Sequence, residues 1–244
     1  MHANVPKIAA HTGCGQAPDN TVASFEEGIA SGAAIVEVDI RLTKDRVAVL
    51  LHDDSPLLQQ YSYEELNQLE QRVQLHPSYQ DYELARLEDV LRLTGGDGVQ
   101  LNLDMKSQDA IDPALQLVLS LGMADRVFVT GCSEGTAKRY ESIRVLYNAP
   151  ITVDFSAESS YTQYARTVCQ TALELGYYGL NLNASTCRQE LVELAHASGL
   201  VVWVYTVNEA AAMEKLVRMG VDAITTREVQ TLAGVLQLAG ERIS

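Results

Sequence analysis

The sequence has few cysteines, few basic residues and no long apolar run, and each shortage excludes a class of protein. Its 4 cysteines show no C-x-x-C spacing and no accompanying histidine pattern, so neither a zinc site nor a disulfide framework is expected. The 18 Lys and Arg against 32 Asp and Glu give a formal net charge of −14, which argues against nucleic acid or an anionic membrane surface as a partner.

No apolar run approaches the length of a membrane span, and no basic segment followed by an apolar stretch opens the chain. We therefore predict a cytoplasmic protein with reduced thiols. A small anionic substrate would need positive charge concentrated locally, from a metal or from a few placed cations. The sequence leaves the oligomeric state open.

The 244 residues alternate between short β-type segments and stretches of helical periodicity. Strands are predicted at Ile8–His11, Ile35–Leu42, Val47–His52, Val99–Lys106, Val127–Thr130, Ile151–Phe155, Gly179–Asn183, Val201–Val207 and Ala223–Thr226. Helices are predicted at Thr21–Ser31, Glu64–Gln71, Leu87–Leu93, Pro113–Leu121, Glu134–Ile143, Thr162–Leu175, Arg188–Ala197 and Glu209–Met219. About eight repeats favour a closed (β/α)8 TIM-type barrel, which takes roughly 250 residues. An open doubly wound sheet is disfavoured because no Gly-x-Gly-x-x-Gly turn follows a strand.

One connection is too short for a helical crossover. Only residues 43–46 join Ile35–Leu42 to Val47–His52, which predicts an antiparallel hairpin with one arm outside the regular barrel. The segment from about 54 to 84 is the least regular and is rich in Gln and Tyr. We interpret it as a short insertion after the His52-Asp53 strand, within a single domain that spans 1–244.

Reactive side chains gather at the ends of several predicted strands, where a (β/α) barrel places its active site. Two carboxylates share one strand face by the two-residue alternation of a strand, and so do an acid and an amine two strands later. The predicted site contains His11, Glu37, Asp39, His52, Asp104 and Lys106.

These residue types fit one kind of chemistry. Three carboxylates from neighbouring strands suit a hard divalent cation such as Mg²⁺ or Ca²⁺. Two histidines beside them could serve as a general acid and a general base near neutral pH. Lys106 would place a point charge against a phosphate oxygen. Together they favour metal-assisted displacement at phosphorus.

Each residue alone also has a structural explanation. A Glu-x-Asp pair on a strand is usually solvated or salt-bridged, a single histidine often caps an element, and Asp104 could simply pair with Lys106. The combination favours function because these residues lie in segments dominated by Val, Ile and Leu, where burying polar groups without a task is costly. Trp203 either packs in the core or lines the mouth beside the substrate, and the sequence does not decide between them.

Several motifs match one family as a set and in order. Residues 8–54 hold a histidine after the first strand, a Pro-Asp-Asn-Thr helix start, Glu37-x-Asp39, a Thr-Lys-Asp turn and His52-Asp53. Leu101–Lys106 adds an acid-x-Lys strand, and Val201–Thr226 adds a Trp, a Thr-Val-Asn and a Gly-Val-Asp. The sequence resembles the glycerophosphodiester phosphodiesterase family over these stretches. From about 125 to 200 it resembles the family only in element order.

The resemblance implies a (β/α) barrel that hydrolyses glycerophosphodiesters to an alcohol and glycerol 3-phosphate, with a role in lipid metabolism. It implies a divalent cation on Glu37, Asp39 and Asp104. It also implies that His11 and His52 form the acid–base pair, that Lys106 holds phosphate, and that a neighbouring glycerol hydroxyl attacks first to form a cyclic phosphate.

The sequence departs from the family pattern around the phosphate. Thr12 stands where an arginine that grips phosphate usually follows the first histidine, and these two residues are not interchangeable. Asp19 and Asp104 each replace a usual Glu, and Thr226 stands where an acidic residue is common. We expect Thr12, Lys106 and Trp203 at the substrate, and we expect these departures to affect phosphate affinity and headgroup choice more than fold or metal.

Three hypotheses follow. The leading one is a metal-dependent phosphodiesterase acting on glycerophosphodiesters. The second, which Thr12 favours, is a weak or inactive relative that binds a phosphorylated ligand. The third is an unrelated barrel hydrolase acting on a carbonyl or carboxylate substrate, which leaves Lys106 beside the carboxylates unexplained.

Overall fold

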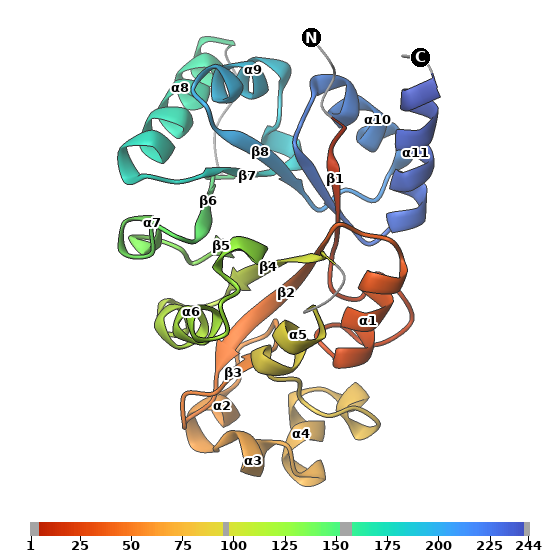
Figure 1. The fold of residues 1–244 in the computed structure, drawn as a ribbon, viewed down its shortest axis with the longest axis vertical. Helices are drawn as coiled ribbons and strands as arrows, with labels where there is room; N and C mark the ends of the chain where they lie inside the picture. Colours follow the sequence, from red (N-terminus) through yellow and green to blue (C-terminus); the bar gives the residue numbers. More distant parts are fainter. Residues whose placement is uncertain (1–4, 95–97, 152–157, 242–244) are drawn as a thin grey trace.

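The computed structural model describes residues 5–94, 98–151 and 158–241. In it, the predicted alternation of strands and helices forms a closed ring of parallel strands. β1 pairs with both β2 and β9, so the ring has no open edge and the predicted (β/α)8 barrel is confirmed (Figure 1). In ring order the parallel strands are β1 (Lys7–Ala10), β2 (Ile35–Leu42), β4 (Gln100–Met105), β5 (Val127–Gly131), β6 (Arg144–Asn148), β7 (Gly179–Asn183), β8 (Val201–Tyr205) and β9 (Ala223–Thr226).

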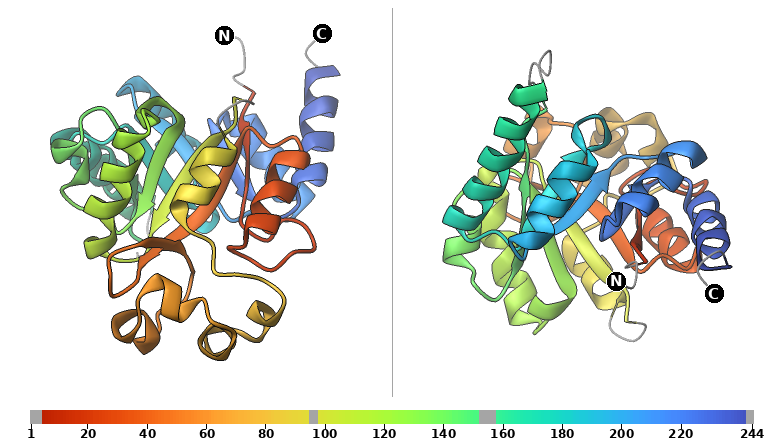
Figure 2. Two further views of the ribbon diagram at one scale, coloured as in Figure 1. Left: turned by 60° about the horizontal axis from the view of Figure 1, so that its bottom comes forward. Right: turned by 90° about the horizontal axis from the view of Figure 1, so that it is seen from above.

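Helices cover the outside of the ring (Figures 1 and 2). They are α1 (Val22–Ala30), α5 (Leu87–Leu93), α6 (Ile111–Ser120), α7 (Thr136–Arg139), α8 (Glu158–Leu175), α9 (Gln189–Ala197), α10 (Ala210–Met219) and α11 (Val229–Glu241). Short 3₁₀ turns lie at Gln108–Ala110, Ala124–Arg126 and Ala184–Thr186. Over the described residues, no helix is both long and apolar enough to cross a membrane.

The predicted hairpin is present. β3 (Ala48–Leu50) runs antiparallel to the end of β2, with Ile40 opposite Leu50, and lies outside the ring. The insertion that follows consists of α2 (Pro56–Gln60), α3 (Tyr63–Leu66), α4 (Leu69–Leu75) and a 3₁₀ turn at Pro77–Gln80. It packs on β3 through a small apolar cluster that includes Leu51, Leu66 and Tyr79, and it lies beyond one end of the barrel (Figure 2).

The sixth strand differs from the prediction. The helix expected at Glu134–Ile143 shrinks to Thr136–Arg139, and β6 occupies Arg144–Asn148, between β5 and β7 in the ring. The sequence Arg-Val-Leu-Tyr-Asn is short and lacks a clear two-residue alternation, so no strand is predicted there. The strand predicted at Ile151–Phe155 falls almost wholly on residues 152–157, which lie outside the described residues.

The barrel interior has an apolar layer beneath a polar one. Side chains from Ala9, Ile35, Phe128, Leu146, Trp203 and Ala223 fill the apolar layer. The next inward positions along the same strands are polar, for example Glu37 two residues after Ile35 and Thr130 two residues after Phe128. Val36 and Val38 point the other way and join the main core under the helices. The strand alternation thus places a layer of inward-facing polar side chains at the C-terminal end of the barrel, which we call the polar floor.

Candidate active site

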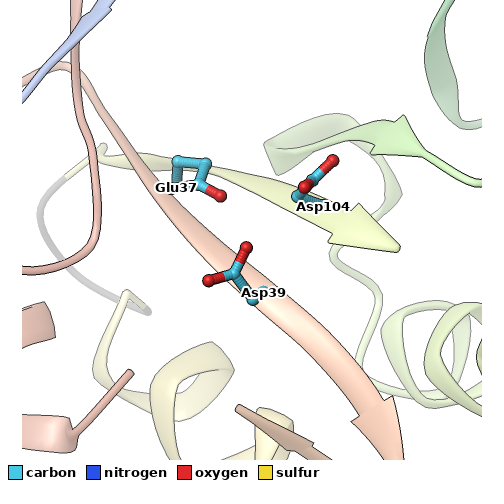
Figure 3. Close-up of side chains that lie close together, drawn as sticks. All are labelled: Glu37, Asp39 and Asp104. Atoms are coloured by element: carbon cyan, nitrogen blue, oxygen red, sulfur yellow. The ribbon is translucent and has the colours of Figure 1, made fainter. Parts of the chain in front are cut away.

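Three carboxylates meet on this polar floor. Glu37 and Asp39 come from the inward face of β2, and the register pairs Asp39 with Asp104 on β4. One oxygen of each carboxylate lies within 4.8 Å of the others, and the three groups point toward a common space (Figure 3). Glu37 and Asp39 are 5% and 1% exposed, so both carboxylates are shielded from solvent.

Hydrogen bonds orient each carboxylate. The backbone N–H of Thr12 donates to Oε2 of Glu37 at 3.3 Å. Asn20 Nδ2 donates to Oδ2 of Asp39 at 2.7 Å, and Thr130 Oγ1 donates to Oδ1 of Asp104 at 2.9 Å. Lys106 Nζ lies between the two aspartates, 2.7 Å from Asp39 and 2.5 Å from Asp104.

The local charge fits a divalent cation. Burial, and then the neighbouring Asp39 and Asp104, raise the pKa of Glu37 well above its ordinary value. Burial alone would lower the pKa of Lys106, but the two flanking carboxylates outweigh it and hold that pKa above its usual range, so the amine stays charged. One lysine against three carboxylates leaves an excess of buried negative charge, which a hard oxygen-preferring cation would neutralise.

Each of the two predicted histidines has a defined tautomer. His11 Nδ1 lies 2.7 Å from the carbonyl oxygen of Thr12, which can only accept, so Nδ1 carries the proton and Nε2 faces Glu37 at 3.9 Å. His52 Nδ1 lies 2.7 Å from a carboxylate oxygen of Asp53, which again leaves Nε2 as the reactive nitrogen. Burial lowers the pKa of His11.

Two cavities meet at these histidines. The inner one, of about 310 Å³, contains the carboxylates and Lys106, and its wall is completed by Asn102, Thr130, Asn148, Asn181, Tyr205, Thr206 and Thr225. The outer one, of about 500 Å³, shares His11 and His52 and is otherwise lined by Pro18, Asp19, Asn20, Leu51, Asp53, Leu75, His76, Ser78, Tyr79 and Arg227. The insertion therefore forms one wall of the outer cavity.

A sequence profile described as the glycerophosphoryl diester phosphodiesterase family matches residues 11–231 of this chain. The chain belongs to that family. Membership makes it a phosphoric diester hydrolase by class.

Relatives and solved structures agree with this assignment. A glycerophosphodiester phosphodiesterase of Bacillus altitudinis is 27% identical over 236 residues, covering 90% of this chain and 94% of the relative. A probable glycerophosphodiester phosphodiesterase of Mycobacterium tuberculosis is 28% identical, covering 92% and 87%. The structure of a phosphodiesterase from Oleispira antarctica, solved in complex with the product sn-glycerol-3-phosphate, superposes with a TM-score of 0.78 at 23% identity, covering 96% of this chain and 97% of that one. This last likeness shows the shared fold.

Two residues expected at the substrate lie elsewhere. Thr12 is 3% exposed and lines neither cavity, because its hydroxyl accepts the backbone N–H of Asn20 at 2.6 Å. Trp203 is buried in the apolar layer, and the centroid of its ring lies 4.5 Å from that of Phe128. The packing interpretation therefore describes its position. Tyr205, two positions later on the same strand, faces the inner cavity instead.

Several residues of the site are not predicted from the sequence. Asn148, Asn181 and Tyr205 bring polar groups to the inner cavity from strands without an acid or a histidine, and Tyr79 comes from the irregular insertion. Strand alternation from Trp203 could have placed Tyr205 toward the mouth. No local pattern marks Arg227, which reaches the site only because the ring closes.

Asn20 provides a test of how Asp39 is held. Its backbone is left-handed, with φ of 62°, and its side chain both donates to Asp39 Oδ2 and accepts the Asp39 N–H at 3.0 Å. We expect Asn20→Gly, which tolerates this backbone, to weaken divalent-cation binding about 10-fold or more in a calorimetric titration. Asn20→Ala should lose the same contacts and add about 1–2 kcal/mol of backbone strain, seen in chemical denaturation. Unchanged cation affinity in Asn20→Gly would show that Asp39 needs no such support.

Proposed function

We propose that this protein hydrolyses glycerophosphodiesters to an alcohol and glycerol 3-phosphate, and that it requires a divalent cation, Mg²⁺ or Ca²⁺, for this reaction. The observation that carries the proposal is the convergence of three carboxylates, two of them buried, and two histidines of defined tautomer on one cavity. Family membership supports the reaction class. A cytoplasmic location and a role in lipid metabolism remain predictions from the sequence.

Glu37, Asp39 and Asp104 would hold the cation, and Lys106 would contact a phosphate oxygen from the same side. When bound, the cation supplies Lewis acidity and neutralises charge that develops on the phosphoryl oxygens. The Asp39–Asn20 and Asp104–Thr130 hydrogen bonds fix the donor oxygens in place before substrate arrives.

His11 and His52 divide the proton transfers. The Nε2 atom of one accepts the proton of the attacking hydroxyl, as an oxygen–phosphorus bond forms. The Nε2–H of the other protonates the oxygen of the departing alcohol, as its bond to phosphorus breaks. If the attacking hydroxyl belongs to the glycerol, a cyclic phosphate results, and water opens it with the two histidines in exchanged roles.

The second hypothesis, a binding protein without turnover, has lost its main support. Thr12 suggested a missing phosphate contact, but its side chain lies outside both cavities and an arginine lines the outer one. The two histidines and the three carboxylates predicted for the site all line the inner cavity.

The test is product analysis. Purified protein would be incubated with several glycerophosphodiesters in Mg²⁺, Ca²⁺ or EDTA, and glycerol 3-phosphate would be detected through its dehydrogenase. We expect product with a divalent cation and none with chelator. Turnover that ignores chelation would refute the cation requirement, and a folded protein that turns over no diester would leave the binding-protein hypothesis.

A further inference from the structure

The two cavities contain little uncommitted positive charge for an anionic substrate. Lys106 already contacts two carboxylates. A phosphodiester placed between His11 and His52 would also lie close to three carboxylates, so it needs a cation on the outer side. Among the described residues that line the outer cavity, Arg227 is the permanently charged base.

Closure of the barrel brings Arg227 to this place. β9 pairs with β1 in a register that sets Thr226 beside Ala10, and the His11 N–H donates to the Thr226 carbonyl at 2.8 Å. Arg227 follows directly, at the same rim of the barrel as His11. Its guanidinium reaches the loop between β1 and α1, across 208 residues of sequence.

The guanidinium is held at one end. Nη1 donates to the Gly13 carbonyl at 3.1 Å and to Asp19 Oδ1 at 3.0 Å, and Nη2 donates to Asp19 Oδ2. Gly13 leaves room for this pair, since a Cβ there would lie 1.8 Å from Asp19 Oδ1 and 2.5 Å from Arg227 Nη1. The pairing with Asp19 fixes the position and the plane of the arginine.

The other edge of the guanidinium is open. A guanidinium has five N–H groups, and the contacts to Gly13 and Asp19 use three of them. The two that remain, on Nε and Nη2, are parallel and have no partner among the described residues. Such an edge matches two oxygens of a phosphoryl group. The side chain is 37% exposed, so a ligand can reach it.

We propose that Arg227 binds the phosphoryl group of the substrate through its Nε and Nη2 edge, and that Asp19 and Gly13 hold it there. This inference rests on the proposed function for the identity of the substrate. Arg227, directly after β9, supplies the positive charge that position 12 lacks.

The test measures binding apart from turnover. Glycerol 3-phosphate would be titrated calorimetrically into the cation-loaded protein, and KM and kcat would be measured for sn-glycero-3-phosphocholine. We expect Arg227→Met to raise the dissociation constant and KM about 10-fold or more, and Arg227→Lys to raise them less, because a lysine keeps the charge and loses the fork. Arg218→Met is the matched control, since Arg218 pairs with Glu214 on the outer helix α10. It should change neither value.

Asp19→Asn separates phosphate binding by Arg227 from a purely structural role in holding the loop. Asparagine keeps one oxygen that can accept from the guanidinium and removes the competing negative charge. If Arg227 binds phosphate, this variant should therefore bind glycerol 3-phosphate as tightly as the wild type or more tightly. If Arg227 only ties down the loop, Asp19→Asn and Arg227→Met should weaken binding equally and lower Tm together, which would overturn the inference. Wild-type-like binding by Arg227→Met would overturn it as well.

The proposed function can fail independently. A wild-type protein that hydrolyses no diester but binds glycerol 3-phosphate in an Arg227-dependent way would refute the enzyme and keep the role of Arg227. Hydrolysis that is unaffected in Arg227→Met would keep the proposed enzyme and refute the role of Arg227. A wild-type protein that neither binds nor hydrolyses would refute both.

Discussion

His11→Ala and His52→Ala should each lower kcat by about 10²-fold or more, with a much smaller effect on KM. The reason is that each imidazole has its Nδ1 proton committed, to the Thr12 carbonyl or to Asp53, so that only Nε2 is free to exchange protons with substrate. A positioned acid or base contributes about 10²–10⁴-fold to a rate. Steady-state kinetics at saturating cation would measure the loss.

A third histidine serves as the control. His196 also pairs with an aspartate, Asp222, at 2.8 Å, but it lies on α9 outside the barrel. His196→Ala should therefore keep the wild-type kcat. The His52 side chain is 63% exposed, so His52→Ala should change the free energy of unfolding by no more than about 0.5 kcal/mol. Full activity in either site variant would remove that histidine from the mechanism.

Addition of Mg²⁺ or Ca²⁺ should raise the melting temperature by about 5–10 °C at a free cation concentration near 100 times its dissociation constant. Binding to the folded state alone contributes about 2.7 kcal/mol at that ratio. A domain of this length shifts by about 2–4 °C per kcal/mol. Burial, and then the neighbouring Asp39 and Asp104, raise the pKa of Glu37, and a bound cation would offset the cost of keeping these carboxylates charged. Calorimetry with and without EDTA would measure it.

Glu37→Gln should separate stability from activity. It removes a buried charge while keeping the shape, so the cation-free protein should melt at or above the wild-type temperature. The same change should abolish both the cation-dependent rise and turnover. Asp112→Asn, at a half-exposed carboxylate paired with Arg139, should keep both responses. A cation-dependent rise that survives in Glu37→Gln would place the cation elsewhere.

The parts of the fold that the sequence predicted are those with a strong local period. β2 matches its predicted range Ile35–Leu42 because apolar and charged residues alternate along it from Val36 to Leu42. The same alternation placed Glu37 and Asp39 inward and allowed the carboxylate cluster to be predicted. β6 was not predicted, because Arg144–Asn148 is short and carries polar residues at both ends.

The parts of the site that the sequence did not predict depend on contacts distant along the chain. Arg227 lies beside Asp19 only through the register of β9 on β1, and no pattern near residue 227 indicates it. Thr12 illustrates the converse. Its position next to His11 suggested a role at the substrate, but a turn at Asn20 takes up its hydroxyl. Local spacing therefore predicted the carboxylate cluster, whereas the contacts of Thr12 and Arg227 depend on the tertiary structure.

The pairing of β9 with β1 has a consequence for the timing of activity. During synthesis, a chain that has emerged as far as β8 already contains both histidines and all three carboxylates, but its barrel is open along β1. The carbonyl of Thr226 that receives the His11 N–H and the guanidinium beside Asp19 arrive with the final strand. We therefore expect the nascent polypeptide to remain catalytically inactive until β9 pairs with β1.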